Sequence, residues 1–240
     1  MMNRLELANT KNFIIKNKKY SNQPVLLIID HASGYGTSIH LSTWAHFWKT
    51  FGLLSTTVEF NNPNPFAAMI PHFFEMIPIY GTGKDIIMKM VKRLMRGDCV
   101  LIAPEGAPPY GKYTNTGFIQ EMFTGPARVA YTYWKLTGKK LIIQPVCSLG
   151  ANNAFPPYPS KKKIKKTKII VKFGKAYTLT FSEVPSREEI KEKTHQIAMS
   201  VAKIWGQKKL IPNYSMTRRK EFEKTGEHRV YKSYSRDEEN

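Results

Sequence analysis

The sequence predicts an α/β fold: one domain built on a mixed, mostly parallel sheet with helices on both faces. Three observations support this fold class. Continuous apolar runs of strand length recur along the chain and end at Pro, Asp or Gly, as in buried parallel strands. Segments with apolar residues at helical spacing separate these runs. The 240 residues, 42% of them hydrophobic, suffice for one large domain or two small ones.

The strand-like runs are short and apolar. The first continuous run, "PVLLIID", is the clearest of them. We expect strands at residues 24–30, 55–60, 98–103 and 140–146, followed by a late hairpin or two short strands at 168–174 and 176–181. Alternation of these strands with helices places the helices on the faces of the sheet.

The helix-like segments carry apolar faces and recognisable ends. We expect helices at residues 38–51, 84–96 and 126–136, and a last one opened by Ser186, with Glu189 completing a capping box. The segment 66–81 is apolar, aromatic and broken by two prolines. These segments indicate three parts: a basic extension or short helix at 1–20, an α/β domain at 21–206, and a charged tail at 207–240 that is either a docking arm or disordered.

The charge of the chain points to an anionic partner. The formal net charge is +19, and "KKKIKKTK" at 161–168 concentrates it. Nucleic acid, acidic lipid and a phosphorylated substrate all fit this charge, and composition alone does not choose among them.

Cysteine content and hydropathy indicate the compartment. The two cysteines, Cys99 and Cys147, lie in apolar runs, and we expect both to be reduced thiols in the core. The start of the chain has no apolar signal region, and no apolar run approaches the ~18 residues of a membrane span. No Cys/His cluster suggests a metal site. We therefore expect a cytoplasmic protein that is soluble or peripherally bound to a membrane.

Two candidate functional residues follow strand runs directly. His31 comes after "PVLLIID", and Glu105 and Gly106 come after "CVLIAP". The carboxyl ends of parallel strands are where α/β proteins gather their chemistry, so an imidazole and a carboxyl group are expected in one cleft. The alternatives are a histidine that caps the next turn and a turn with a solvated glutamate.

The order of these segments resembles the glycerolipid acyltransferase family, which includes lysophosphatidate acyltransferases. The block "DHASGYG" at 30–36 is similar to that family's NH-x-S-x-x-D block, and "LMRGDCVLIAPEG" at 94–106 is similar to its strand ending in PEG. Further similar blocks are "MIPIYGTG" at 76–83, "GPARVA" at 125–130 and "IIQPV" at 142–146. The resemblance covers roughly residues 21–206 and implies an acyltransferase-like fold.

The resemblance also implies a reaction and its residues. His31 would act as general base on an acceptor hydroxyl that attacks an acyl thioester, acyl-CoA or acyl-ACP, with no further cofactor. Asp30 is the adjacent acid, while Glu105, Gly106 and Ser33 would shape the acceptor site. The acceptor would be a lysophospholipid or another lipid hydroxyl at an anionic membrane surface. Four apolar residues would line the acyl groove, face the bilayer or belong to an ordinary core: Phe66, Phe73, Phe74 and Ile77.

Two departures from the family pattern bear on this activity. The acid of the family's histidine block falls on Gly36, which cannot polarise an imidazole. His31 would then use Asp30, Thr37 or Ser38, or work without an acid, and we expect weak activity. The family's phosphate-binding Arg falls near Pro109, so Lys112 is the nearest replacement.

Three other classes stay open at this point. "VCSLG" at 146–150 is similar to the nucleophile elbow of an α/β-hydrolase, although Val146 stands at its first Gly and no helix pattern follows. A nucleic-acid binder would suit the charge, but no recognisable motif is present and no nucleic acid is expected. The third class is a catalytically impaired acyltransferase-like lipid-binding protein.

Overall fold

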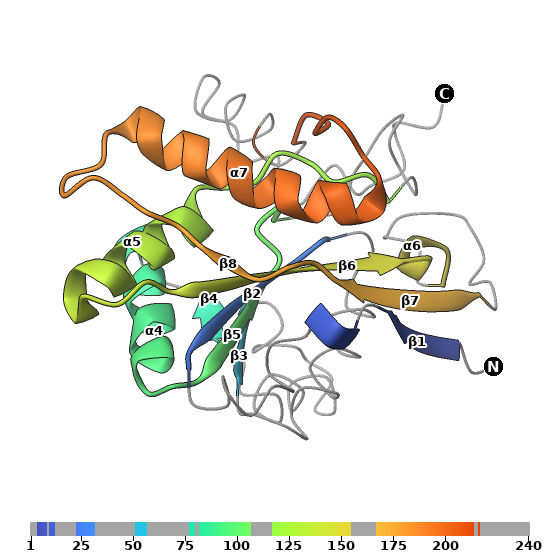
Figure 1. Ribbon diagram of the computed structural model, residues 1–240, viewed down its shortest axis with the longest axis horizontal. Coiled ribbons are helices and arrows are strands. Elements are labelled where there is room, and N and C mark those ends of the chain that lie inside the picture. Colours follow the sequence, from blue (N-terminus) through green and yellow to red (C-terminus); the bar gives the residue numbers. More distant parts are fainter. Residues whose placement is uncertain are drawn as a thin grey trace.

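The computed structural model describes residues 4–8, 10–12, 23–31, 51–56, 77–79, 82–106, 117–154, 167–213 and 216. In Figure 1 these residues form one twisted sheet with helices packed against it. No helix in these ranges is both long and apolar enough to cross a membrane.

The sheet is mixed and mostly parallel, as the sequence predicts. Its strands are β1 (Arg4–Ala8), β2 (Val25–Ile29), β3 (Phe51–Thr56), β4 (Ile77–Ile79), β5 (Cys99–Ile102), β6 (Ile142–Leu149), β7 (Lys168–Phe173) and β8 (Tyr177–Thr178). Their order is β1-β7-β6-β2-β5-β3-β4, with β8 paired to β6. Only β7 and β8 run antiparallel to the neighbour β6; the other described pairs are parallel. The central strand β2 is fully buried, which explains its uninterrupted apolar sequence.

The described helices begin and end at the residues that local chemistry favours. They are the 3-10 turn η1 (Thr10–Asn12), α4 (Gly83–Met95), α5 (Gly125–Thr137), the short α6 (Ala151–Ala154) and α7 (Arg187–Trp205). Thr82 and Asp85 form a reciprocal capping box at α4. At α7, Ser186 accepts a hydrogen bond from the Glu189 N–H, but the Glu189 carboxylate accepts from Ser182 instead of closing the expected box. Gly206 ends α7 in the left-handed conformation, at φ 81°.

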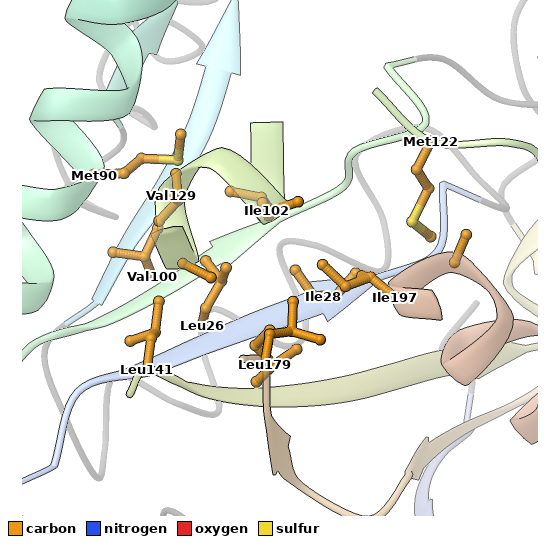
Figure 2. Close-up of a cluster of buried hydrophobic side chains, with 14 of the residues drawn as sticks. Leu26, Ile28, Met90, Val100, Ile102, Met122, Val129, Leu141, Leu179 and Ile197 are labelled. Carbon is orange, nitrogen blue, oxygen red and sulfur yellow. The ribbon is translucent and has the colours of Figure 1, made fainter. Parts of the chain in front are cut away.

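The helices α4, α5 and α7 share one hydrophobic core with the sheet. Leu26 and Ile28 of β2 pack in this core together with Met90 of α4, Val129 of α5 and Ile197 of α7 (Figure 2). Because side chains alternate along a strand, Val25, Leu27 and Ile29 lie on the opposite face, and they too are fully buried. Both faces of the sheet are therefore covered. Residues 38–50 of the helix expected at 38–51 lie outside the described residues.

Two segments differ from the sequence expectation, and a third agrees with one of its two alternatives. Residues 4–8, expected within an extension or short helix, form β1 and pair with β7 in parallel. Phe51, expected to end a helix, begins β3 instead, so this strand starts four residues earlier than the expected 55–60. The late segments form two short strands, which confirms that alternative over the hairpin: each of them pairs with β6.

Candidate functional site

The candidate site lies where the neighbouring strands β2 and β5 end. These strands run parallel, with Val25 opposite Cys99 and Ile28 opposite Ile102. Asp30 and His31 follow β2, and the turn with Glu105 and Gly106 follows β5. In parallel strands in this register, both carboxyl ends reach the same edge of the sheet.

A direct hydrogen bond joins the two strand ends. The backbone N–H of His31 donates to Oε1 of Glu105 at 2.8 Å. His31 is half-buried, and its Nδ1 atom is buried. The prediction that His31 and Glu105 share one edge of the sheet is therefore confirmed.

Glu105 is held by a network of protein donors. Its Oε2 atom accepts from the backbone N–H of Gln120 at 2.9 Å and from the Gln120 side-chain amide at 3.2 Å. The residue is only 1% exposed. Burial raises the pKa of Glu105 to about 8, while the N–H groups of His31 and Gln120 oppose this rise.

These contacts decide one of the two expectations for Glu105. A carboxyl group that is 1% exposed and bonded to His31 and Gln120 is not the solvated glutamate of a surface turn. The other expectation, that Glu105 helps to shape the acceptor site, stays a prediction. In the structure Glu105 ties the end of β5 to the backbone of His31 at the end of β2.

Asp30 is bonded to a different strand. Its Oδ1 atom accepts from the Ser148 N–H at 2.7 Å, and the Ser148 hydroxyl lies 3.0 Å from both carboxylate oxygens. Asp30 is 3% exposed, and Ser148 is fully buried in β6. These bonds satisfy the buried carboxylate and anchor the end of β2 to β6. They give Asp30 a structural role besides the catalytic one expected from its place next to His31.

The nucleophile-elbow hypothesis placed Ser148 at an exposed turn. In the structure Ser148 lies within β6, and the turn comes two residues later at Gly150, with φ 81°. The short helix α6 does follow that turn, although the sequence shows no helix pattern there. A nucleophilic serine needs an accessible hydroxyl, whereas the Ser148 hydroxyl is buried against Asp30.

Gly106 occupies a position that requires glycine. Its φ is +78°, and a Cβ atom there would lie 2.8 Å from the ring of Phe123. The turn is closed by the Gly106 N–H donating to Ala103 O at 3.3 Å. Glycine therefore lets Phe123 pack directly over the backbone beside Glu105.

A groove of about 1110 Å³ opens next to this turn. Pro104 and Gly106 line it together with residues of α4, α5 and the segment before α7. Its apolar lining includes Ile86, Ile87, Met90, Ile102, Phe123, Pro126, Val184, Pro185 and Ile190. Three cationic residues, Lys84, Arg128 and Arg187, also line the groove, and among the described residues no acidic side chain does. Such a lining suits a molecule with an apolar chain and an anionic group.

Several expected site residues lie outside the described residues. They are Ser33, Gly36, Lys112, Phe66, Phe73, Phe74 and most of the basic run at 161–168. Ile77 is described: it is buried and belongs to the core cluster, in agreement with the core alternative. Within the described ranges, no group of three His, Cys, Asp or Glu residues could hold a metal ion.

Sequence reasoning missed two polar residues that hold the site, Gln120 and Asn213, and considered a third, Ser148, only as the nucleophile of an esterase. All three are buried. Gln120 and Asn213 stand in stretches without helix or strand periodicity, where a buried amide cannot be told from an exposed one. Ser148 offered a signal, because a serine inside an apolar strand needs a buried partner.

The described residues form an α/β protein with a mixed, mostly parallel sheet and a candidate site at the ends of β2 and β5. No protein-family model and no curated protein matches the sequence. A solved structure that is similar is the crystal structure of the 1-acyl-sn-glycerophosphate (LPA) acyltransferase, PlsC, from Thermotoga maritima. It superposes with a TM-score of 0.58 over 86% of this chain and 74% of that chain, at 12% sequence identity. At this identity the similarity establishes the fold.

Proposed function

We propose that this protein transfers a fatty acyl group from an acyl thioester to a hydroxyl of a lipid acceptor, with His31 as general base. The observation that carries the proposal is the hydrogen bond from the His31 N–H to Glu105, at the shared edge of β2 and β5. The acyltransferase fold of the similar structure supports it.

The reaction follows from the chemistry of an imidazole at this edge. A neutral imidazole nitrogen of His31 takes the proton of the acceptor hydroxyl as the oxygen attacks the thioester carbonyl. The new C–O bond forms, the C–S bond breaks, and the thiolate leaves with the proton that His31 returns. Acyl-CoA and acyl-ACP both supply such a thioester, and no cofactor is required.

The groove beside Gly106 supports an amphipathic substrate. Its apolar walls fit an acyl chain, and Lys84, Arg128 and Arg187 fit an anionic group of the donor or acceptor. We propose that the chain lies with its carboxyl end toward Gly106, which lines the groove and is the neighbour of Glu105. Ser33 and Lys112 remain proposed contacts of the acceptor, the latter in place of the family's phosphate-binding Arg.

Two alternatives are distinguishable by assay. An esterase would hydrolyse simple esters without a thioester donor, but the buried Ser148 argues against its expected nucleophile. A catalytically impaired lipid-binding protein is favoured by Gly36, which stands where the family carries an acid. It would bind lysolipid and acyl-CoA without forming product.

The test is an acyl-transfer assay followed by mass spectrometry of the lipid products. Wild type, His31→Ala and His195→Ala are incubated with acyl-CoA or acyl-ACP and a panel of lysolipids. His195 is exposed on α7, so it is a matched control. We expect product with wild type and His195→Ala, and at least a hundredfold less with His31→Ala. Full activity of His31→Ala would refute the proposal.

A further inference from the structure

Residues 207–213, which follow α7, pack against the segment that holds Glu105. We call residues 207–213 the strap. They belong to the part expected as a docking arm or disordered tail. Ile211 is 8% exposed, and Asn213 is 1% exposed, so the strap is part of the folded domain.

The strap is joined to residues 119–121 by a single parallel β-bridge, between Ile211 and Gln120. The Ile211 N–H donates to Ile119 O at 3.2 Å, and the Glu121 N–H donates to Ile211 O at 3.0 Å. The side chain of Gln207 extends this pairing: it accepts from the Ile119 N–H at 2.8 Å and donates to Ile119 O at 2.9 Å. These four bonds surround Gln120, the residue that donates twice to Glu105.

Asn213 closes the network on the Glu105 backbone. Its amide Nδ2 donates to Glu105 O at 2.9 Å and also to Glu121 O, while its Oδ1 accepts from the Met216 N–H at 3.0 Å. One buried amide therefore binds the turn after β5 and the 117–123 segment together. Asn213 thus binds the backbone carbonyl of Glu105, while the side-chain carboxyl of the same residue accepts from the His31 N–H.

We propose that Asn213 and Gln207 are positioning residues, through which the strap sets the place of His31 by way of Glu105. The inference rests on the proposed function, since it deepens the role of that same site. Small displacements in such a site slow the reaction: a shift of about 1 Å in a reacting group can lower the rate about a hundredfold. Supporting contacts of this kind hold a reacting group in place.

Asn213 is buried, so water cannot readily replace the hydrogen bonds that its side chain makes. Removing its amide leaves the backbone carbonyl of Glu105 in a buried hydrogen bond, and that of Glu121 in a part-buried one, without this donor. The turn relaxes toward another donor, and the carboxyl group of Glu105 moves with it. Asn153 on α6 is exposed and serves as a matched control for the loss of an asparagine side chain.

The experiment compares Asn213→Ala, Gln207→Ala and Asn153→Ala in the full chain. Steady-state acyl transfer is measured well below the unfolding temperature of each variant. We expect Asn213→Ala to lower kcat at least tenfold with the KM of the acyl donor within about twofold. Gln207→Ala, which leaves the buried Asn213 in place, provides the same test if Asn213→Ala does not fold. Asn153→Ala keeps the wild-type kcat.

A second readout does not need activity. The ¹H–¹⁵N resonance of the His31 backbone amide reports its hydrogen bond to Glu105. We expect this resonance to shift in Asn213→Ala or Gln207→Ala and not in Asn153→Ala. An unchanged kcat together with an unchanged His31 amide resonance would overturn the inference. If wild type transfers no acyl group, the proposed function fails, while the amide resonance still decides whether the strap positions His31.

Discussion

His31 and Glu105, which are 74 residues apart in the sequence, are joined by one hydrogen bond from a backbone N–H to a buried carboxyl oxygen, 2.8 Å long. The bond connects the ends of two neighbouring strands. Its acceptor is 1% exposed and also accepts two hydrogen bonds from Gln120, and it is not among the described residues that line the groove.

The first prediction concerns pH and stability. Because burial raises the pKa of Glu105 from 4.5 to about 8, the folded protein keeps a proton that the unfolded chain loses between these values. The free energy of unfolding therefore falls as pH rises through this window and levels off above it. One linked proton gives a slope of at most about 1.4 kcal/mol per pH unit.

Glu105→Gln removes this titration. Urea unfolding at pH 5 to 8.5 should show a shallower decline for Glu105→Gln than for wild type. Glu183→Gln, at an exposed position, should keep the wild-type slope. Equal slopes in wild type and Glu105→Gln would show that Glu105 is ionised throughout this range.

The second prediction concerns Gly106. Gly106→Ala places a methyl group at φ +78° and 2.8 Å from the Phe123 ring. We expect the free energy of unfolding to fall by about 1–3 kcal/mol, because the left-handed conformation is strained and the ring must move. Denaturant unfolding of wild type and variant measures this difference in the free energy of unfolding. Gly83→Ala, where no atom lies within 4 Å, should be neutral or slightly stabilising. An unchanged free energy of unfolding in Gly106→Ala would contradict this prediction, because it would mean that the turn accepts a methyl group without strain.

The third prediction separates the structural role of Ser148 from a catalytic one. Ser148→Ala removes a hydroxyl that lies 3.0 Å from both oxygens of the buried Asp30 carboxylate. We expect a loss of about 1–3 kcal/mol in unfolding free energy. Activity per folded molecule should stay within about threefold of wild type. Thr180→Ala, on the surface, is the control. Abolished ester hydrolysis in a folded Ser148→Ala variant would favour the esterase.

The strand ends were predictable from the sequence, but the bonds between them were not. "VLLII" and "CVLI" are apolar enough to indicate central strands, and parallel pairing then brings His31 and Glu105 together. The partners of Glu105 depend on residues 119–121 and on the strap, which carry no periodic pattern. Their structure comes from tertiary hydrogen bonds. The strand β1 did carry a signal, since "RLELA" alternates polar and apolar residues, but it is short and pairs only at the sheet edge.

The fourth prediction concerns the membrane. We propose reversible binding to anionic bilayers through the basic run at 161–168, most of which lies outside the described residues. Each Lys near an acidic surface contributes about 1 kcal/mol, so replacing five by Gln should nearly abolish binding to acidic vesicles. The variant carries Gln at Lys161, Lys162, Lys163, Lys165 and Lys166.

Sedimentation with acidic and neutral vesicles measures this binding. The control variant loses the same charge at five exposed lysines of the described residues: Lys139, Lys175, Lys191, Lys203 and Lys208. It should retain most of the binding. Equal losses in both variants would show that net charge, not the basic run, attracts the membrane. Equal binding of wild type to both kinds of vesicle would rule out an electrostatic mechanism.

The last prediction concerns the acid that the family carries and this chain lacks. Position 36 lies outside the described residues, so the prediction rests on its spacing from His31. The Asp30 carboxylate, the nearest acid in sequence, already accepts hydrogen bonds from Ser148. In a serine-protease triad, removing the charge of the orienting acid lowers the rate about 10⁴-fold. A carboxylate introduced by Gly36→Asp should therefore raise kcat, and we expect a gain of about tenfold or more, because it stabilises the imidazolium that forms on His31.

The matched control is Gly36→Asn, which has nearly the same shape without the charge and should give no such gain. The double variant His31→Ala/Gly36→Asp should stay inactive, since the introduced acid acts only through the imidazole. If Gly36→Asp and Gly36→Asn both match wild type, another group already orients His31. Because Glu105 reaches His31 through the backbone N–H, it cannot stabilise the imidazolium by direct hydrogen bonding through that contact. The orienter would then have to be Asp30 or a hydroxyl of Thr37 or Ser38, and Asp30→Asn would be the variant that loses activity.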